Sequence, residues 1–278
     1  MEGTREPMYE LPEIEYWKMI LAGQLSGKTI EHISTPDKVM HKQLTGIIKQ
    51  IQGVLVWHIE RRGLYLSFHL DNGQRFVIEL NNDTAISIIS TKELRDKKPK
   101  SLNVHFSDQV LQLQNISVEQ IQLISVREAE QQFKPLGLDP LDRSFTLERM
   151  QQIFAQKRSS IKTAYLDQTL IAGIGDKYSD EIAFAARLSP AYKMNELTSE
   201  QWESLYEATR NVLKQAVDHY IALDCPVYEP TSNLDQYKEH LQVFEREGIA
   251  CPNCKQPIVK KVIARKKTYL CHTCQPTN

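Results

Sequence analysis

The residues best suited to chemistry are four of the five cysteines. They form two CxxC pairs, Cys251 with Cys254 and Cys271 with Cys274, separated by sixteen residues. Each pair can present two thiolates from one tight turn, and two pairs complete a tetrahedral site, so the spacing predicts a zinc ribbon. Four thiolates leave no coordination position for a substrate. We therefore expect one structural Zn²⁺ and no catalytic metal.

Two other interpretations of these cysteines are a pair of disulfides and a redox-active CxxC. A disulfide framework is typical of small secreted chains, and a redox CxxC is typical of a βαβ setting. Neither condition holds for this sequence, so the zinc interpretation is favoured over both.

Basic residues surround the cysteine pairs. From Gly248 to Asn278 the chain has no Asp or Glu but has six Lys or Arg residues. The segment between the pairs, QPIVKKVIARKKTYL, alternates like a β-hairpin and places Arg265 and Lys266 at its tip. Such a basic tip suits phosphate contact or entry into a groove of a nucleic acid. A solvated lysine-rich turn is the common alternative.

The composition limits what the rest of the chain can be. A chain of 278 residues can bury a sizeable core and is expected to form two domains. Its formal net charge of -1 excludes a uniformly basic nucleic-acid binder but allows local basic patches. No apolar run approaches the roughly 18 residues of a membrane span, and MEGTREPM does not resemble a signal peptide. We expect a cytoplasmic protein without a membrane partner.

The first half of the chain is strand-like. YELPEIEYW, from Tyr9 to Trp17, predicts a helix start because Pro12 suits the first turn and carboxylates suit its positive end. Tight turns are expected at Gly63 and Gly73. Between about residues 27 and 124, six short runs rich in β-branched or aromatic residues predict a β-sandwich or barrel: GKTIEHI, GVLVWHIE, GLYLSFHL, QRFVIEL, AISIIS and VLQLQNI.

The second half is helical. Thr146 and Ser160 are expected to cap helices, and Thr198 with Gln201 forms a capping box before a long amphipathic helix. Its apolar stripe is expected to be core. The predicted organisation is an N-terminal helix and β-sandwich domain over 1–134, a linker over 135–145, a helical domain over 146–245 and a zinc finger over 246–278.

Between the helices, TLIAGIGDKYSDEIAFAARL places Gly173 and Gly175 in a turn before a second helix. The amides at the start of that helix are suited to hold a phosphate. LDQTLIAGIGDKYSDEIAF closely resembles the helix-two-turn-helix signature of the formamidopyrimidine-DNA glycosylase and endonuclease VIII family. The cysteine spacing, the linker LGLDPLD, the start ELPEIE and GKTI also resemble that family, in the same order, from Tyr9 to Gln275.

The resemblance implies an α+β fold in which an N-terminal β-sandwich with flanking helices precedes a helix-two-turn-helix domain with a C-terminal zinc ribbon finger. It also implies double-stranded DNA as the partner of a monomer, and places the protein in the bacterial cytoplasm. In the family, an N-terminal Pro directly before ELPE attacks the sugar and forms a Schiff base. Tyr9 occupies that place here. An internal amide nitrogen is not a nucleophile, and if translation begins at Met8 instead of Met1, Tyr9 should keep Met in place.

The resemblance assigns roles to other N-terminal residues. Glu10 matches the catalytic acid and Glu13 an assisting or structural carboxylate, although carboxylates at a helix start are common without such a role. The hairpin lysine is replaced by Leu64. The Met that fills the gap left by an everted base falls near Asn82, and the Arg and Phe of the duplex wedge align with residues 115–119.

The DNA-backbone contacts of the family are partly kept. Lys162 matches a phosphate-binding lysine, whereas Asp176 replaces an Asn that donates to phosphate and would repel it. Lys266, with Arg265 adjacent, takes the place of the finger arginine but lacks its bidentate fork. Three residues at the start of the second helix are further candidate DNA contacts: Gly175, Lys177 and Tyr178. For Tyr178, a packing role is equally plausible.

We therefore predict a DNA-binding protein of this base excision repair family that binds damaged or distorted duplex DNA without Schiff-base lyase chemistry. The alternative is a monofunctional DNA glycosylase in which Glu10 activates water to release a damaged base. Retention of ELPE favours the enzyme, whereas loss of the wedge and of the lysine replaced by Leu64 favours the binder. A zinc-ribbon protein that acts through protein partners would explain the cysteines but not the glycine turn.

Overall fold

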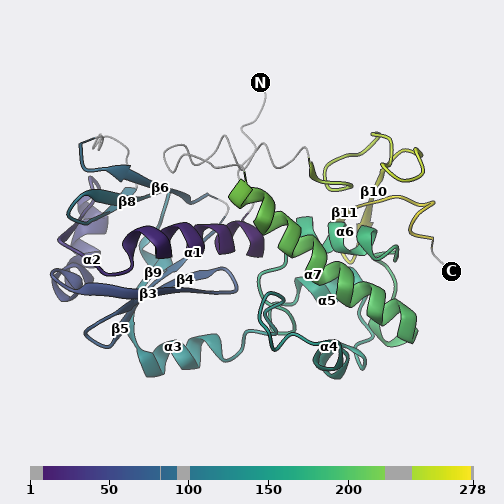
Figure 1. Cartoon of the computed structure of the whole chain (residues 1–278), viewed down its shortest axis with the longest axis horizontal. Helices are drawn as coiled ribbons and strands as arrows, with labels where there is room; N and C mark the ends of the chain where they lie inside the picture. The colour runs from purple at the N-terminus through teal and green to yellow at the C-terminus, as the bar shows by residue number, and fades with distance from the viewer. Residues whose placement is uncertain (1–8, 82, 93–100, 223–239, 277–278) are drawn as a thin grey trace. The chain divides into compact units, whose positions relative to one another are not determined.

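The computed structural model describes residues 9–276 apart from 82, 93–100 and 223–239 (Figure 1). The chain divides into two compact units. Among the described residues, unit 1 contains Tyr9, Glu13–Lys134 and residues 220–222. Unit 2 contains Glu10–Pro12, Pro135–His219 and residues 240–276.

Unit 1 is built on two antiparallel sheets, which confirms the predicted β-sandwich. Five strands form one sheet in the order β1-β3-β4-β5-β9. Four form the other in the order β2-β7-β8-β6. The strands are β1 (Lys28–Thr29), β2 (His32–Ser34), β3 (Leu55–Arg62), β4 (Tyr65–Leu70), β5 (Gln74–Glu79), β6 (Ala85–Ser90), β7 (Ser101–His105), β8 (Gln109–Gln114) and β9 (Ile121–Ser125).

The sandwich core comes from strand alternation. In the four-stranded sheet Ile86, Leu113 and Leu102 lie at matching positions of neighbouring strands and are fully buried. Phe68 and Phe76 pair across β4 and β5 and are equally buried. The expected turns also form, because Gly63 and Gly73 adopt left-handed φ values of 55° and 81° between their strands.

Several elements of unit 1 differ from the sequence expectation. The run GKTIEHI divides into β1 and β2, which belong to different sheets. Strands β7 and β9 were not predicted, since polar residues interrupt their apolar pattern. Helix α2 (Lys38–Ile51) lies within the region expected to be strand-like. Asp37 caps this helix by accepting from the amides of Val39 and Met40 at 2.8 and 3.1 Å.

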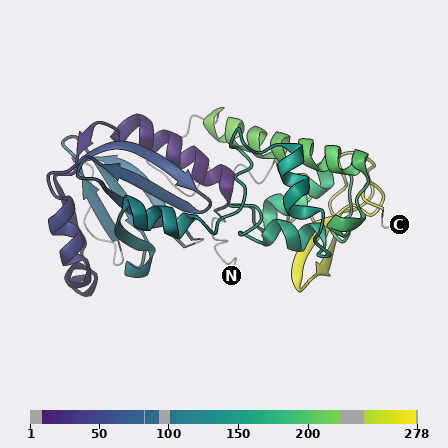
Figure 2. The ribbon, with the colours of Figure 1, turned by 90° about the horizontal axis from the view of Figure 1, so that it is seen from below.

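Helix α1 (Leu11–Leu25) begins where the sequence predicted and runs along the five-stranded sheet (Figure 2). Arg61 of β3 donates to Glu15 at 2.8 Å, which ties the helix to that sheet. Helix α3 (Val126–Phe133) follows β9 and starts with a capping box between Ser125 and Glu128. A short 3-10 helix, η1, spans Val118–Gln120.

Unit 2 contains the helices α4 (Leu147–Phe154), α5 (Ile161–Leu166), α6 (Asp176–Ala185) and the 3-10 helix η2 (Met194–Glu196). It also contains most of α7 (Ser199–Ala222). Thr146 and Ser160 cap α4 and α5 as expected. The predicted stripe of α7 is core, since Leu205, Leu213 and Ala216 are fully buried. A hairpin of β10 (Val259–Ile263) and β11 (Lys266–Leu270) projects from the helices (yellow in Figure 2).

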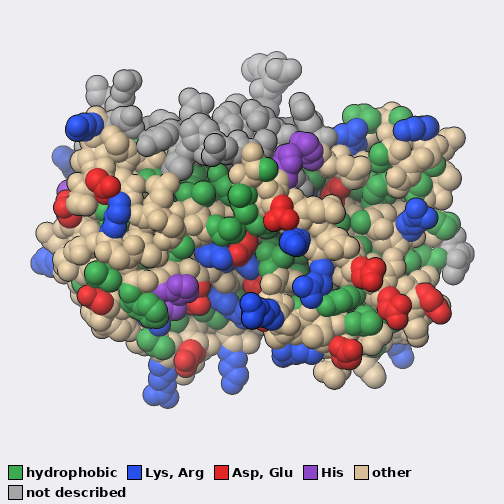
Figure 3. Space-filling view, viewed as in Figure 1, with side chains coloured by type: hydrophobic (Ala, Val, Ile, Leu, Met, Phe, Trp, Pro, Cys, Tyr) green, Lys and Arg blue, Asp and Glu red, His purple; other side chains and the backbone are tan. Residues whose placement is uncertain are grey.

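On the face drawn in Figure 3, Lys and Arg side chains are interspersed with Asp and Glu. This mixture on the drawn face fits the formal net charge of -1. No helix in the described part of the chain has both the length and the apolar character needed to cross a membrane.

Candidate metal centre and nucleic-acid interface

The loop between α5 and α6 is shaped by two glycines and one glutamine. Gln168 closes it, because its side chain accepts from the amide of Gly173 at 2.7 Å and donates to the carbonyl of Ile174 at 2.8 Å. Gly173 has a left-handed φ of 87°. A Cβ atom at Gly175 would lie 2.7 Å from Cδ of Glu10, so only glycine leaves room for that carboxylate.

Glu10 is held at the start of α6. Its carboxylate accepts from the amides of Gly175, Lys177 and Tyr178 at 2.7, 2.8 and 3.1 Å. The side chain is 2 % exposed. Amides at the start of a helix suit an anion. Here three of the amides that we expected to hold a phosphate bind a carboxylate of the chain itself.

Lys162 is fully buried on α5. Its ammonium donates to the carbonyl of Asp176 at 2.8 Å, to Oγ of Ser179 at 2.9 Å and to Oδ1 of Asp180 at 2.8 Å. It also lies 3.3 Å from the Asp176 carboxylate. All of these acceptors belong to the first two turns of α6. The predicted contact between Lys162 and a DNA phosphate stays a prediction, and the structure gives this ammonium internal partners.

Asp180 and Glu181 join α6 to the C-terminal part of unit 2. The second oxygen of Asp180 accepts from the amide of Tyr269 on β11 at 2.8 Å. Burial raises the pKa of Asp180, and the charge of Lys162 opposes this rise by favouring the ionised carboxylate. Glu181 accepts from three successive amides at distances of 2.8 to 2.9 Å, those of Gln242, Val243 and Phe244.

Sequence analysis missed both carboxylates. Their signal is a charged pair set among residues that are otherwise apolar and buried, since Tyr178, Ile182 and Ala183 are all fully buried. A charged pair at such positions needs internal partners, because an unpaired buried charge is costly.

The other predicted residues of α6 have different surroundings. The ring of Tyr178 is fully buried, so its side chain is a packing residue. The ammonium of Lys177 lies 4.7 Å from the centre of that ring, a cation–π distance. Asp176 is partly exposed. Direct DNA contacts by Gly175, Asp176, Lys177 and Tyr178 therefore stay predictions.

Tyr9 and Glu13 lie in unit 1. The Tyr9 ring is 4 % exposed, and burial raises the pKa of its hydroxyl, so this group stays neutral. Glu13 is buried and accepts from the hydroxyl of Tyr220 at 2.5 Å. Tyr9 is thus a core residue of unit 1.

The residues aligned with the wedge and the hairpin lysine are ordinary parts of unit 1. Leu64 forms the β3–β4 turn with Gly63 and accepts from the amide of Leu80 at 3.0 Å. Asn115 has a left-handed φ of 56°, and Glu119 lies in η1. Asn82 lies outside the described residues.

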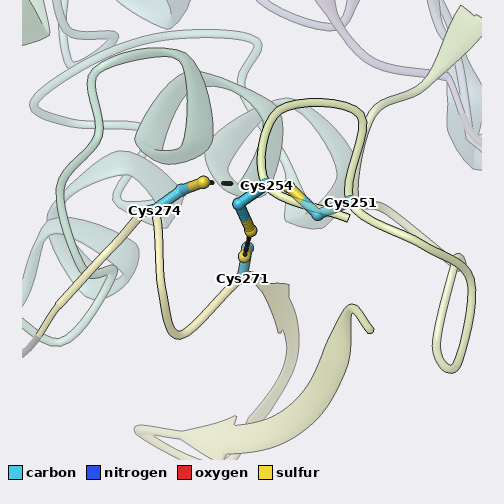
Figure 4. Close-up of side chains that lie close together, drawn as sticks. All are labelled: Cys251, Cys254, Cys271 and Cys274. Atoms are coloured by element: carbon cyan, nitrogen blue, oxygen red, sulfur yellow. Dashed lines mark hydrogen bonds between the residues drawn. The ribbon is translucent and has the colours of Figure 1, made fainter. Parts of the chain in front are cut away.

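The four predicted cysteines converge (Figure 4). Their sulfur atoms lie within 4.8 Å of one another, and the pairs come from two turns at the base of the β10–β11 hairpin. The donor set fits Zn²⁺, because four thiolates can surround a tetrahedral ion. The amide of Gln256 lowers the pKa of Cys254 to about 7, and burial raises that of Cys274 to about 12. A bound cation would keep all four deprotonated, and the site is closed, so this is one structural zinc centre.

The hairpin tip is basic and exposed. Ile263 pairs with Lys266, which leaves Ala264 and Arg265 as a two-residue turn. Both have left-handed φ values, 50° and 65°, which are unfavourable for residues other than glycine. Arg265 and Lys266 are exposed, as the prediction of a phosphate-contacting tip requires.

The fold and the cysteine centre together define an α+β protein of the helix-two-turn-helix and zinc-hairpin class. Residues 8–118 match the family model described as the formamidopyrimidine-DNA glycosylase N-terminal domain, and residues 136–223 match the helix-two-turn-helix domain of the same enzyme. The formamidopyrimidine-DNA glycosylase of Symbiobacterium thermophilum is 31% identical over 277 residues, which cover 97% of this chain and 90% of that protein. This chain belongs to the formamidopyrimidine-DNA glycosylase family, whose members act on damaged DNA in base excision repair.

Other relatives support the same family membership. The formamidopyrimidine-DNA glycosylase of Desulfitobacterium hafniense is 29% identical over 278 residues, covering 96% of this chain and all of that protein. Two solved complexes of the Lactococcus lactis enzyme, one with abasic-site DNA and one with DNA containing FAPY-dG, have TM-scores of 0.83. Both are 24% identical to this chain and cover 96% of it and 100% of their own chains. This likeness establishes a shared fold.

Proposed function

We propose that this protein binds damaged or distorted duplex DNA, as a monomer, without Schiff-base lyase chemistry. The observation that carries the proposal is the residue directly before Glu10. In place of a terminal amine stands Tyr9, whose nitrogen is part of a peptide bond and whose ring is core in unit 1. An amide nitrogen cannot attack a sugar carbon, because its lone pair is delocalised into the carbonyl.

The same proposal is supported at the β3–β4 turn. Leu64 stands where the family has a lysine, and its side chain offers neither a positive charge nor a nucleophile. DNA binding would instead rest on unit 2, where Arg265 and Lys266 are exposed on a hairpin without acidic residues. The related Lactococcus lactis structures, which share this fold, are complexes with DNA.

A second candidate is a monofunctional glycosylase in which Glu10 activates water. It is favoured by the three amide donors that hold this carboxylate in one orientation, since a base must be fixed and ionised to take a proton. A protein that only binds DNA has no evident need for a carboxylate so placed.

The deciding experiment incubates the protein with duplexes that carry oxidised, abasic, alkylated or crosslinked bases. Released base and borohydride-trapped protein–DNA adducts are measured in parallel, with a gel shift on the same duplexes. A shift with neither product is the expected result. Base release without trapping, lost in Glu10→Gln, would establish the water-using glycosylase. Trapping would overturn the proposal, since it requires an amine at the sugar.

A further inference from the structure

Three sets of contacts meet on the first two turns of α6. The first amides of this helix hold Glu10, the ammonium of Lys162 binds its next residues, and Asp180 accepts from Tyr269. Tyr269 lies two residues before Cys271, a ligand of the predicted zinc centre. A chain of direct contacts therefore runs from the zinc centre to the amides that hold Glu10.

The central link is an ion pair without access to solvent. The side chains of Lys162 and Asp180 are both fully buried, and their charged atoms are 2.8 Å apart. Each charge is further satisfied, Lys162 by Ser179 and by the carbonyl of Asp176, and Asp180 by the amide of Tyr269. A buried pair of this kind tolerates little displacement, because loss of either partner leaves an uncompensated charge. It can therefore transmit a shift of β11 to the start of α6.

We propose that Lys162 and Asp180 are positioning residues that couple the zinc centre to the amides that hold Glu10. Lys162 then acts through α6, and not by contact with a DNA phosphate. This inference rests on the proposed function only where it assigns importance to Glu10. The coupling itself belongs to the free protein and can be tested without DNA.

The first test uses the wild-type, full-length protein. Zinc is removed with a chelator, and hydrogen exchange is followed at the amides of Gly175, Lys177 and Tyr178. We expect exchange at least about tenfold faster in the zinc-free protein, because the pair loses its anchor on β11. Unchanged exchange at these amides, with faster exchange confined to the cysteine hairpin, would overturn the coupling.

The second test breaks the link in the zinc-loaded protein. Asp180→Asn is expected to speed exchange at Tyr269 and at the three amides that bind Glu10. The matched control is Glu181→Gln, the same loss of charge on the next residue, which should affect only residues 242–244. Met150→Ala is the control for general destabilisation, since Met150 is a buried core residue of α4. If Asp180→Asn and Met150→Ala change the exchange rate equally at every amide, the proposal is wrong.

If Asp180→Asn does not fold, a milder variant provides the same test. Ser179→Ala removes one acceptor of Lys162 and leaves the ion pair. We expect a smaller acceleration, about threefold, at the same amides. Because coupling between two sites is reciprocal, Glu10→Gln should in turn weaken zinc retention in a chelator competition. No change in zinc retention would count against the coupling.

The third test separates positioning from phosphate contact. Lys162→Met should weaken DNA binding while the slope of log K against log salt stays at the wild-type value. Lys266→Ala is the control, whose slope should be shallower by about one phosphate contact. A slope shallower by the same amount in Lys162→Met would overturn the positioning role. If the protein does not bind DNA at all, the proposed function fails, and the exchange tests still decide the coupling.

Discussion

The two units of the molecule differ in how their residues compare with the site roles that the resemblance assigns. In unit 2, Glu10 is bound by three amides, and the cysteines converge beneath an exposed basic hairpin. In unit 1, the positions that the resemblance aligns with the family's nucleophile and hairpin lysine hold Tyr9 and Leu64. Under the proposed function, unit 2 keeps residues suited to DNA binding, whereas unit 1 holds Tyr9 where the resemblance places the nucleophile.

A physical reason for the difference is that the site residues of unit 2 also serve its fold. Glu10 satisfies three amides at a helix start, so its loss would leave buried donors without partners. The side chain before it is not needed to satisfy these amides, and a tyrosine at that position gains buried contact. A tyrosine at position 9 is therefore compatible with stability, whereas loss of the Glu10 carboxylate should lower the free energy of unfolding.

The largest expected effect concerns the metal. Removal of zinc, or Cys254→Ala, should unfold the cysteine hairpin and reduce DNA affinity more than about tenfold, since metal binding supplies the folding energy of such modules. A gel-shift titration measures this loss. Cys225→Ala is the control, because this cysteine stands outside the two pairs. Unchanged affinity in Cys254→Ala would show that the hairpin of unit 2 is not part of the DNA-binding surface.

The next effect concerns Gly175. A methyl group there meets Glu10 at 2.7 Å, so Gly175→Ala should lower the free energy of unfolding by about 1 to 3 kcal/mol through overpacking. Denaturant unfolding provides the measurement. Gly46→Ala, within α2 and with nothing within 4 Å, should instead be neutral or stabilising. Equal effects of the two substitutions would show that Glu10 is not held tightly.

A smaller effect is expected at the hairpin tip. Lys266→Ala should make the slope of log K against log salt shallower by about one contact, with a modest loss of affinity. Lys28→Ala, in unit 1, serves as control because its ammonium is already paired with Asp108 at 2.7 Å. If Lys28→Ala gives the shallower slope and Lys266→Ala does not, unit 1 provides the DNA surface and the comparison between the units is reversed.

The smallest effect depends on pH and belongs to unit 1. Burial alone would raise the pKa of Glu15, but the charge of Arg61 and hydrogen bonds from Lys18 and Arg61 lower it below the ordinary value. Its stabilisation is therefore present above the ordinary pKa and is lost as the pH falls. Between about pH 5 and pH 3 the wild-type protein should lose about 1 kcal/mol more stability than Glu15→Gln. Parallel pH profiles from thermal unfolding would contradict this.

The sequence was most informative where local chemistry decides structure. The cysteine spacing, the caps at Thr146 and Ser160 and the glycine turns at Gly63 and Gly73 each depend on a few neighbouring residues, and the structure confirms them. Helix α2 was missed, although Asp37 caps it, because its β-branched residues fit the strand pattern around it.

Partners distant in the sequence could not be predicted. Lys162 matches a phosphate-binding lysine of the family by position, yet tertiary contacts bury it against Asp180. The amides that suited a phosphate are likewise occupied by Glu10. A helix start indicates that an anion is needed there, but the pattern does not reveal whether that anion comes from a ligand or from the chain itself.

The separation of 165 residues between Glu10 and Gly175 has a consequence for synthesis. Residues Glu10–Pro12 leave the ribosome early but belong to the second compact unit, so they must wait until α6 has emerged before they find their place. Domains generally fold as units during translation, with N-terminal units first. A nascent chain can thus complete most of the sandwich while Glu10 is still unplaced, and Glu10 is bound only after α6 has been synthesised.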